Sequence, residues 1–362
     1  MIRVLHAADL HLDSPFDALG EEKAALRRRE QRELLRSLAE LRARENCELV
    51  LLSGDLFDSD AAWAETEELV RITLAEMAVP VFIAPGNHDY FRAGGRWSRI
   101  RLPENARVFS SPDFACEVMN DLGVRVWGAA FTDAYSAGKL AELRIPRQDG
   151  FTELVCVHGD VGAPNSRYNP VTEREIAATR ADYIAFGHNH ACSGLRKAGE
   201  TYYAWPGCPE GRGFDEFGEK GVMIVDAGPG KVEARFVPTA ARRYEKLSVP
   251  AEELGSFRLP ADAARNIYEL TVTGETDAAP DLAALRRALE GSCFALRLKD
   301  ATRVRRDVWE RAGEDSLRGV FLAMLRERYA AARTDSEREL VTAAARWGLA
   351  ALDGREEAEP LC

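Results

Sequence analysis

The chain has 362 residues, of which 46% are hydrophobic and 30% are charged, and its formal net charge is −11. This length is too great for one ordinary core and predicts two or three domains. No apolar run approaches the roughly 20 residues of a membrane-spanning helix, and the acidic balance argues against a protein that wraps DNA without specificity.

Short apolar runs in the first two thirds of the chain predict strands that are covered on both faces. In chain order they span residues 3–8, 49–53, 79–84, 154–157 and 183–186. A helical stretch at about residues 21–45 has an apolar stripe of Leu26, Leu34, Leu38 and Leu41. Residues 65–77 predict a second helix. The alternation of strands and helices indicates an α/β layer structure.

Further strands follow with no long helices between them, and they can form a second sheet or extend the first. They span residues 107–110, 114–119, 124–127, 201–205, 222–225 and 232–236. After Pro238 the composition changes. A strand at 266–273, a helix at 281–289 and a strand at 293–298 predict a small β-α-β unit, and residues 315–352 predict a helical tail. We therefore expect a main domain at 1–240, a small α/β accessory (capping) domain at 241–305, and a helical C-terminal tail at 306–362.

The ends of the five buried strands carry side chains that bind metals. These side chains are Asp9, His11, Asp55, Asn87, His88, His158, His188 and His190. Five of the six histidines fall at these positions. Any one of these residues alone is better explained as a capping aspartate or a core histidine. Together they predict a cleft beyond the carboxyl ends of the strands, where ligands of α/β sheets bind.

Several carboxylates and imidazoles that converge in one cleft need cations to offset their charge and desolvation. Mixed nitrogen and oxygen ligands suit manganese, iron, zinc or cobalt better than calcium. Two metals about 3.5–4 Å apart need a shared ligand, and Asp55, from a central strand, is the natural bridge. His6 precedes this set by three residues and is interpreted either as a partner of a ligand or as a core histidine.

Cysteine usage and the first residues predict the compartment. The seven cysteines include no close Cys-x-x-Cys pair, and several lie in or beside apolar runs. This pattern fits a reducing cytoplasm better than a disulfide framework or a zinc knuckle. The chain runs directly into the apolar residues 2–5, so we expect no secretion signal, no membrane partner and a cytoplasmic location.

At this point the sequence resembles a known family. The runs ADLHLD, SGDLFD, PGNHDY, CVHGD and FGHNH match, in order, the five signature motifs of the calcineurin-like metallophosphoesterases, within residues 4–190. The opening HAADLHLDSPF and the later WPGCPEGRGFDEFGEKG, residues 205–221, resemble the DNA-repair exonuclease branch of the SbcD and YhaO type, over residues 1–240. The resemblance implies the layered metallophosphoesterase fold in the main domain.

The resemblance also implies roles for single residues. The first of two divalent metal ions, Mn²⁺ in preference to Fe, Zn or Co, would be held by Asp9, His11, Asp55 and His190. The second would be held by Asp55, Asn87, His158 and His188. His88 would donate a proton or a hydrogen bond to the leaving oxygen, and Asp89 would orient His88. The implied partners are DNA as substrate, an SMC-like ABC ATPase bound through the C-terminal helices, and a second copy of the chain. The C-terminal helices could equally pack on their own domain.

Weaker signals concern substrate contacts. Arg92 and Arg96 follow His88 closely and can hold a phosphate backbone, with Trp97 stacked on a base. Arg212 lies in the segment that resembles the exonuclease branch and can line a substrate channel. For Arg92 and Arg96 the alternative, a solvated loop with one packing tryptophan, is slightly favoured, and ordinary loop packing explains Arg212 equally well. Asp160, just after His158, is interpreted as a turn residue or as an extra carboxylate near the second metal.

Three functions remain open from the sequence. The first is a DNA exonuclease or endonuclease of a repair complex, because bound cations can reverse the local field of an acidic protein. The second is a phosphodiesterase or phosphatase for a small nucleotide or a lipid headgroup, which the net charge favours slightly. The third is a non-catalytic scaffold, although a scaffold needs neither the ligand set nor His88.

Overall fold

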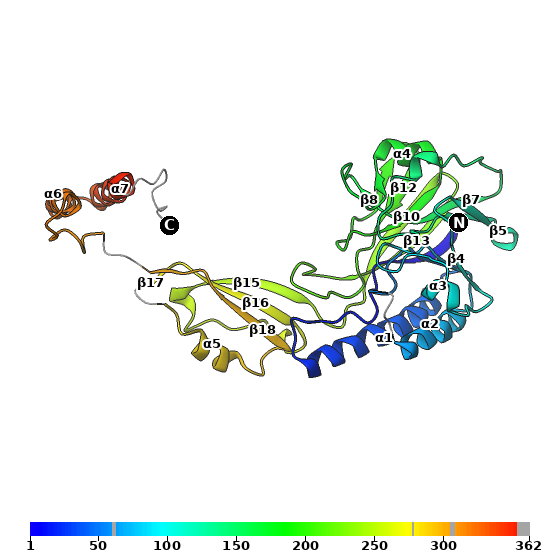
Figure 1. The fold of residues 1–362 in the computed structure, drawn as a ribbon, viewed down its shortest axis with the longest axis horizontal. Coiled ribbons are helices and arrows are strands. Elements are labelled where there is room, and N and C mark those ends of the chain that lie inside the picture. The colour runs from blue at the N-terminus through cyan, green and yellow to red at the C-terminus, as the bar shows by residue number, and fades with distance from the viewer. Residues whose placement is uncertain (60–62, 277–278, 305–307, 353–362) are drawn as a thin grey trace. The chain divides into compact units, whose positions relative to one another are not determined.

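The computed structural model describes residues 1–59, 63–276, 279–304 and 308–352. These residues form two compact units, one of Met1–Glu245 with Arg265–Ile267 and one of Lys246–Ala264 with Tyr268–Cys362 (Figure 1). The first division falls five residues beyond the expected end of the main domain at 240. The expected boundary at 305/306 lies outside the described residues, and the helical tail is grouped with the small sheet.

The first unit contains two six-stranded sheets. The first sheet has the order β14-β13-β1-β2-β3-β4. Its strands are β1 (Ile2–Ala7), β2 (Leu49–Leu52), β3 (Val81–Ile83), β4 (Ala106–Val108), β13 (Gly221–Gly228) and β14 (Lys231–Pro238). Strands β1 to β4 are parallel, whereas β13 runs antiparallel to β1 and β14 antiparallel to β13.

The second sheet has the order β11-β12-β10-β7-β6-β5. Its strands are β5 (Ala115–Met119), β6 (Val124–Gly128), β7 (Thr152–His158), β10 (Tyr183–Gly187), β11 (Arg196–Ala198) and β12 (Thr201–Ala204). The four inner strands are parallel, and the two edge strands are antiparallel to their neighbours. The later strands thus do both things that the sequence left open: β4, β13 and β14 extend the first sheet, and β5, β6 and β12 help to build the second.

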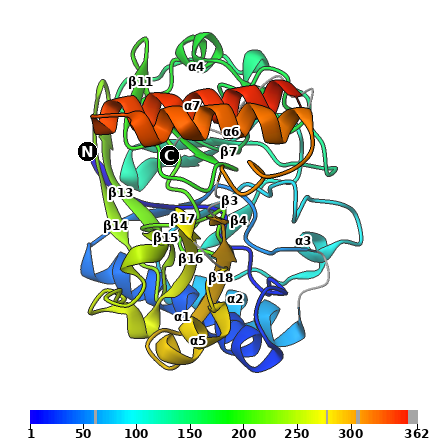
Figure 2. The same ribbon diagram turned by 90° about the vertical axis from the view of Figure 1, so that its left-hand side faces the viewer.

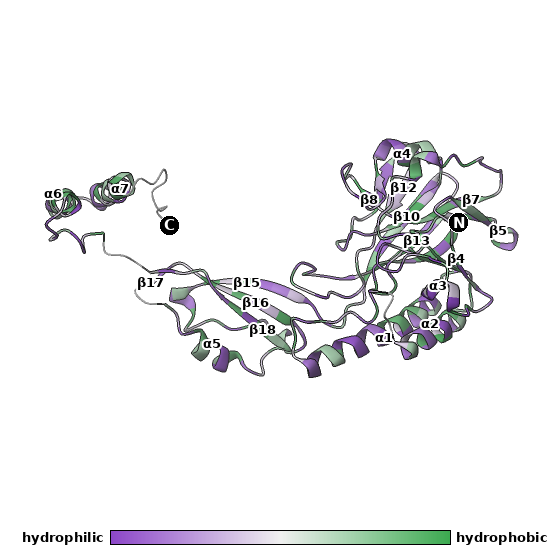
Figure 3. Ribbon diagram, in the orientation of Figure 1, coloured by the Kyte–Doolittle hydropathy of each residue, from purple (hydrophilic) through white to green (hydrophobic). Residues whose placement is uncertain are grey.

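Helices cover the outer faces of the two sheets. The first sheet carries α1 (Glu21–Arg44), α2 (Ala64–Glu76) and the short α3 (Arg96–Arg99), and α4 (Glu173–Thr179) lies on the second (Figure 1). Leu34, Leu38 and Leu41 of α1 are buried against the first sheet, as the helical stripe predicts, and Leu26 is half-buried. Figure 3 shows hydrophilic and hydrophobic residues interspersed along α1, as expected for a helix that covers a sheet.

Three apolar clusters hold this unit together. One lies between the two sheets, with Val4, Leu51 and Phe82 from the first sheet and Leu154 and Ala185 from the second. The other two lie between each sheet and its helices.

The α4 helix was not expected from the sequence. It has seven residues and begins with a capping box in which Thr172 and Glu175 satisfy each other's backbone amides.

Short elements complete the first unit. They are the two-stranded pair β8 (Asp160–Val161) and β9 (Pro170–Val171), and the 3₁₀ helices η1 (Asn120–Leu122) and η2 (Leu140–Glu142). A further 3₁₀ helix, η4 (Ala263–Arg265), has its first two residues in the second unit and its last in the first. None of the helices in the described parts of the chain is both long and apolar enough to cross a bilayer. The described cysteines are all free thiols.

The second unit is built on a three-stranded sheet of β15 (Tyr244–Pro250), β16 (Ile267–Thr273) and β18 (Ala295–Asp300), covered by α5 (Leu282–Leu289) (Figure 1). Leu270 and Val272 are fully buried in its core. The expected β-α-β pattern corresponds to β16, α5 and β18, and β15 is a third strand that the sequence analysis did not identify. The short β17 (Glu275–Thr276), β19 (Arg303–Val304) and η3 (Ala251–Glu253) complete the unit.

The expected helical tail consists of two helices. They are α6 (Leu317–Ala331) and α7 (Asp335–Leu352), which lie side by side (Figure 2). Gly348 permits the close contact, because a Cβ atom there would collide with the Phe321 ring. Of the apolar positions expected in this tail, Leu317, Leu340 and Trp347 are exposed.

Candidate metal centre

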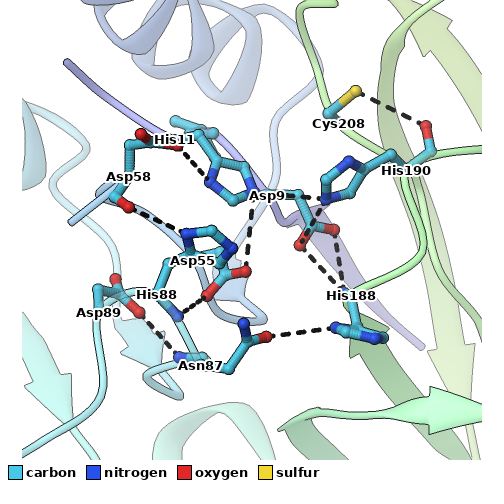
Figure 4. A network of polar contacts seen from close by, with 12 residues as sticks. Asp9, His11, Asp55, Asp58, Asn87, His88, Asp89, His188, His190 and Cys208 are labelled. Atoms are coloured by element: carbon cyan, nitrogen blue, oxygen red, sulfur yellow. Dashed lines mark hydrogen bonds and ion pairs between the residues drawn. The ribbon is translucent and has the colours of Figure 1, made fainter. Parts of the chain in front are cut away.

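The carboxyl ends of the parallel strands of both sheets meet in one place. The first sheet contributes Asp9 and His11 after β1, Asp55 after β2, and Asn87 and His88 after β3. The second sheet contributes His158 at the end of β7, and His188 and His190 after β10. Figure 4 shows the labelled side chains of this set pointing toward one another. The seven residues expected to bind metal are therefore brought together, although their strands belong to two sheets rather than one.

The first group of candidate ligands surrounds His190. Its Nε2 lies 3.4 Å from Nε2 of His11 and 3.9 Å from Oδ1 of Asp9. Nε2 of His11 lies 3.7 Å from Oδ2 of Asp55. Asp9, His11 and His190 each offer one ligand atom within 4.8 Å of the other two, which is the spacing of donors around one cation.

The second group surrounds Asn87. Its Oδ1 lies 3.1 Å from Nε2 of His158 and 3.3 Å from Nδ1 of His188. Nε2 of His158 is also 3.4 Å from Oδ2 of Asp55. The same carboxylate oxygen of Asp55 therefore lies within 4 Å of a histidine nitrogen in each group. This is the position that a bridging ligand of a two-metal site requires.

The hydrogen bonds of the histidines favour a bound cation. Nδ1 of His11 lies 3.1 Å from a carboxylate oxygen of Asp58, and Nδ1 of His190 lies 2.6 Å from one of Glu216. A carboxylate only accepts, so each Nδ1 carries a proton, and in the neutral ring each Nε2 carries a lone pair. With both rings neutral, two lone pairs face each other across 3.4 Å, an arrangement that a cation between them stabilises. The residues present thus fit the group that they would hold.

Burial sets the protonation of the site. It lowers the pKa values of His11 and His158 to about 4 each, so both imidazoles are neutral near pH 7, the form that binds metal. Burial also raises the pKa of Asp9 to about 7, and the negative charge of Asp55 contributes. Burial also tends to raise the pKa of Asp55, but the nearby His158, His11 and His88 outweigh this effect and lower the pKa to about 2. Cations would stabilise both carboxylates in their ionised form.

The backbone at the site is strained and closely approached. Asp9, Asp55 and His188 have positive φ angles of 54°, 51° and 98°. Residues other than glycine rarely adopt such angles. A Cβ atom on Gly54 would collide with the His158 ring, and one on Gly86 would collide with the Asp55 carboxylate. Gly54 therefore lets the end of β2 approach β7 of the other sheet, and Gly86 lets the ends of β2 and β3 approach within the first sheet.

Asp58 and Glu216 support the first group, and the sequence analysis did not identify either. Arg212 joins them, because its guanidinium donates to Asp58 over 2.8 Å and to Glu216 over 2.6 Å. Arg212 was expected as a substrate contact. In the structure Arg212 instead donates to the two carboxylates that hold His11 and His190. Asp58 lies within the motif SGDLFD, but no spacing rule pointed to Glu216, which is 26 residues beyond His190.

His88 and Asp89 differ from expectation in one respect. The exposed His88 uses Nδ1 to donate to the Asp58 carbonyl over 3.0 Å, and its ring is 4.7 Å from that of His11. The buried Asp89 accepts from the amides of Leu56, at 2.9 Å, and Gly86, at 2.8 Å. Among the described residues no hydrogen bond joins Asp89 to the His88 ring. Asp89 therefore braces the two loops that carry Asp55 and His88, and the Asp58 carbonyl orients the imidazole.

The expected basic loop after His88 is only partly accessible. Arg96 is 3% exposed, donates to Glu67 over 3.1 Å and to the Ser59 carbonyl over 2.8 Å, and so cannot contact substrate as expected. Trp97 is also buried and packs 5.4 Å from Phe57, so it offers no face to a base. Arg92 is exposed and stays a candidate substrate contact.

Two further residues have defined surroundings. Oδ2 of Asp160, at the start of β8, lies 3.7 Å from Nε2 of His188, beside the second group. His6 is a core histidine that links the two sheets. Its Nε2 donates to the Phe186 carbonyl over 3.0 Å, and its Nδ1 accepts from the Tyr183 hydroxyl over 2.8 Å. Burial lowers the pKa of His6 to about 3.

Comparisons with known proteins agree with this geometry. The model of the family described as calcineurin-like phosphoesterase matches residues 2–192, a region that holds every candidate ligand. The uncharacterized metallophosphoesterase YhaO of Bacillus subtilis strain 168 is 28% identical over 261 residues, which are 69% of this chain and 63% of YhaO. The chain thus spans less than two thirds of that relative's length.

Two solved structures are similar over about two thirds of this chain. TT1561 of Thermus thermophilus has a TM-score of 0.41 at 13% identity and covers 65% of this chain and 98% of its own. A dimetal phosphatase from Danio rerio has a TM-score of 0.40 at 12% identity and covers 66% of this chain and 99% of its own.

Proposed function

The chain belongs to the calcineurin-like phosphoesterase family, and from that premise we propose that it hydrolyses phosphodiester bonds in DNA. Family membership makes it a metal-dependent phosphoester hydrolase with a dinuclear centre of divalent cations. The observation that carries the proposal is the place of Asp55, whose Oδ2 lies 3.7 Å from His11 and 3.4 Å from His158. Mn²⁺ is the proposed metal on the family resemblance, and the mixture of imidazole nitrogens and oxygens suits it, as it suits Fe, Zn or Co, better than Ca²⁺.

DNA is favoured over a small phosphoester by the segment at residues 205–221, which resembles the exonuclease branch. In the structure this segment supports the metal centre. Glu216 and Arg212 hold His190 and Asp58, and Nζ of Lys220 donates to the His190 carbonyl over 2.7 Å. A segment that only covered the surface would not contact the ligands. The segment that carries the resemblance therefore includes residues that shape the site, and this supports the proposal.

When bound, the two cations lower the pKa of water and offset negative charge on the phosphoryl oxygens. The chain's own residues position these cations and handle the leaving group. Because Nδ1 of His88 donates to the Asp58 carbonyl, its Nε2 is the atom that donates a proton to the leaving oxygen. Proton donation of this kind is worth about 10²–10⁴-fold in rate. Asp89 contributes by holding the loop that carries His88.

The proposal is tested with the purified chain reconstituted with Mn²⁺. Single- and double-stranded DNA, bis-p-nitrophenyl phosphate and p-nitrophenyl phosphate are compared, with Asp55→Asn as the blank. Cleavage of DNA and of the diester, with little action on the monoester, supports a nuclease. Hydrolysis of the small esters without DNA cleavage favours a phosphodiesterase or phosphatase for a small nucleotide or lipid. Metal binding without any turnover would leave only a scaffold.

We predict that His88→Ala keeps its metal and loses about 10²–10⁴-fold in turnover, because it removes the proton donor but no ligand. Metal content is measured by elemental analysis, and turnover is measured with a dinucleoside monophosphate, because its alkoxide leaving group needs a proton whereas p-nitrophenolate leaves without one. Asp149→Ala, a change at an exposed residue to which the site gives no role, is the control. A fully active, metal-loaded His88→Ala would refute the role.

We further propose that α6 and α7 dock on an SMC-like ABC ATPase. Support comes from their exposed apolar side chains, which are Leu317, Val320, Met324, Leu340 and Trp347. Leu340→Glu should abolish complex formation with a purified ATPase of this class while leaving ester hydrolysis intact. Homodimerisation stays a prediction, to be tested by sedimentation of the wild type and of Leu340→Glu. The cytoplasmic location also stays a prediction.

A further inference from the structure

A row of aromatic rings extends from the second group of candidate ligands. The Tyr168 ring lies 5.0 Å from that of His188 with an interplanar angle of 37°. The Tyr135 ring follows at 5.7 Å and 38°, and the Arg167 guanidinium lies 4.5 Å from the centre of the Tyr135 ring. The row thus begins at a metal-binding histidine and ends at a tyrosine that is 51% exposed.

The loops that carry this row are fixed to the metal centre. Ser136 pairs with Tyr168, and its amide donates to the Arg167 carbonyl over 3.0 Å. The buried Asn169 donates to the His158 carbonyl over 2.7 Å and accepts from the Lys139 amide over 2.9 Å. Both loops are therefore held to strand β7, which ends in a candidate ligand. A platform held in this way loses little conformational entropy when a ligand binds.

Packing alone does not explain the outer end of the row. A tyrosine that serves the core is normally covered, whereas half of Tyr135 is exposed. Arg167 is also exposed, and within the described ranges it forms no ion pair with a carboxylate. An aromatic face beside an uncompensated cation is the combination that binds the base and the phosphate of an unpaired nucleotide. Because the Arg167 side chain is long and exposed, it can yield the ring face to a base and take the adjacent phosphate.

We propose that Tyr135, Tyr168 and Arg167 form a stacking subsite for an unpaired nucleobase of the strand that is cut. This inference rests on the proposed action on DNA and names its substrate as single-stranded or frayed. Bases within a duplex have no free face, so paired DNA must open before it occupies the subsite. Stacking tolerates any base, and the subsite therefore confers preference for strand state rather than for sequence.

The test uses Tyr135→Ala, because Tyr168 contacts His188 and its truncation would disturb the metal centre. The full chain with Mn²⁺ is given two oligonucleotides of equal length, one of thymidines and one of abasic residues, and kcat/KM is measured for each. Removal of one stacking ring should reduce the preference for the thymidine strand by about tenfold. Tyr135→Phe keeps the ring and should keep the preference.

A second measurement does not depend on turnover. An oligonucleotide with 2-aminopurine is added to the chain in EDTA, and stacking on Tyr135 should quench its fluorescence in the wild type more than in Tyr135→Ala. An unchanged preference together with equal quenching would overturn the subsite alone. If the wild type hydrolyses bis-p-nitrophenyl phosphate but cuts neither oligonucleotide, the proposed action on DNA fails, and the subsite fails with it.

Discussion

The two groups of candidate ligands meet at Asp55 but are supported in different ways. In the first group, Nδ1 of His11 and Nδ1 of His190 each face a carboxylate, at 3.1 and 2.6 Å, and Arg212 joins the two carboxylates. In the second group, Nδ1 of His158 donates to the Ser53 carbonyl over 2.9 Å. Oδ2 of Asp160 lies 3.7 Å from Nε2 of His188.

This difference has an electrostatic consequence. An anionic partner raises the basicity of a metal-binding imidazole and fixes its orientation, whereas a neutral carbonyl does mainly the second. Glu216 is buried, and its contacts with His190 and Arg212 lower its pKa against the opposing effect of burial, so it is ionised near pH 7. We therefore expect the first group to bind its metal more tightly than the second.

The largest effect is expected from a substitution of Asp55, the ligand that the two groups share. Asp55→Asn should lower the metal affinity of both sites, because one oxygen serves both groups. The loss should exceed the roughly 10–100-fold in affinity that a supporting residue contributes, so that little metal is retained. Elemental analysis after dialysis measures it. Asp149→Asn, at an exposed position, is the matched control. Normal metal content in Asp55→Asn would show that Asp55 is not the bridge.

A smaller effect separates the two groups. Glu216→Gln should weaken the tighter of two Mn²⁺ binding steps by about 10–100-fold, because His190 loses its anionic partner. Asp160→Asn should change the weaker step by less, since its carboxylate is 3.7 Å from His188. Calorimetric titration resolves the steps, with Glu219→Gln as an exposed control. Equal effects of Glu216→Gln and Asp160→Asn would contradict the proposed asymmetry.

The smallest expected effect is on the pH dependence of stability and involves His6, which joins the two sheets. The unfolded chain protonates His6 near pH 6.5, and the folded chain does so only near its pKa of about 3. Between these values the unfolded state binds more protons, so stability falls as the pH decreases. From pH 5.5 to 4.5 the metal-free wild type should lose about 1.4 kcal/mol more than His6→Gln.

Urea unfolding at the two pH values measures this difference. Glutamine can donate to the Phe186 carbonyl and accept from Tyr183, so the variant keeps the link between the sheets without the titration. Parallel losses in the two proteins would mean that His6 does not titrate on unfolding.

Much of the site is visible in the sequence because its ligands are local to strand ends. A buried apolar run predicts a strand, and the polar residue that follows must lie at the edge of a sheet. Asp9, Asp55 and His158 were identified in this way. The tail illustrates the opposite case, because helical periodicity alone did not show that residues 332–334 divide it into α6 and α7.

By itself the amino-acid sequence determined which side chains gather and in what order, since residue type and strand position are properties of short segments. Only the tertiary structure decided that β1, β2 and β3 lie in one sheet and β7 and β10 in another. It also decided that Glu216 and Arg212 hold the ligands, that Arg96 is buried, and that Tyr135 continues a row from His188. These contacts join segments far apart in the chain, and their distances depend on how the two sheets pack rather than on any local pattern.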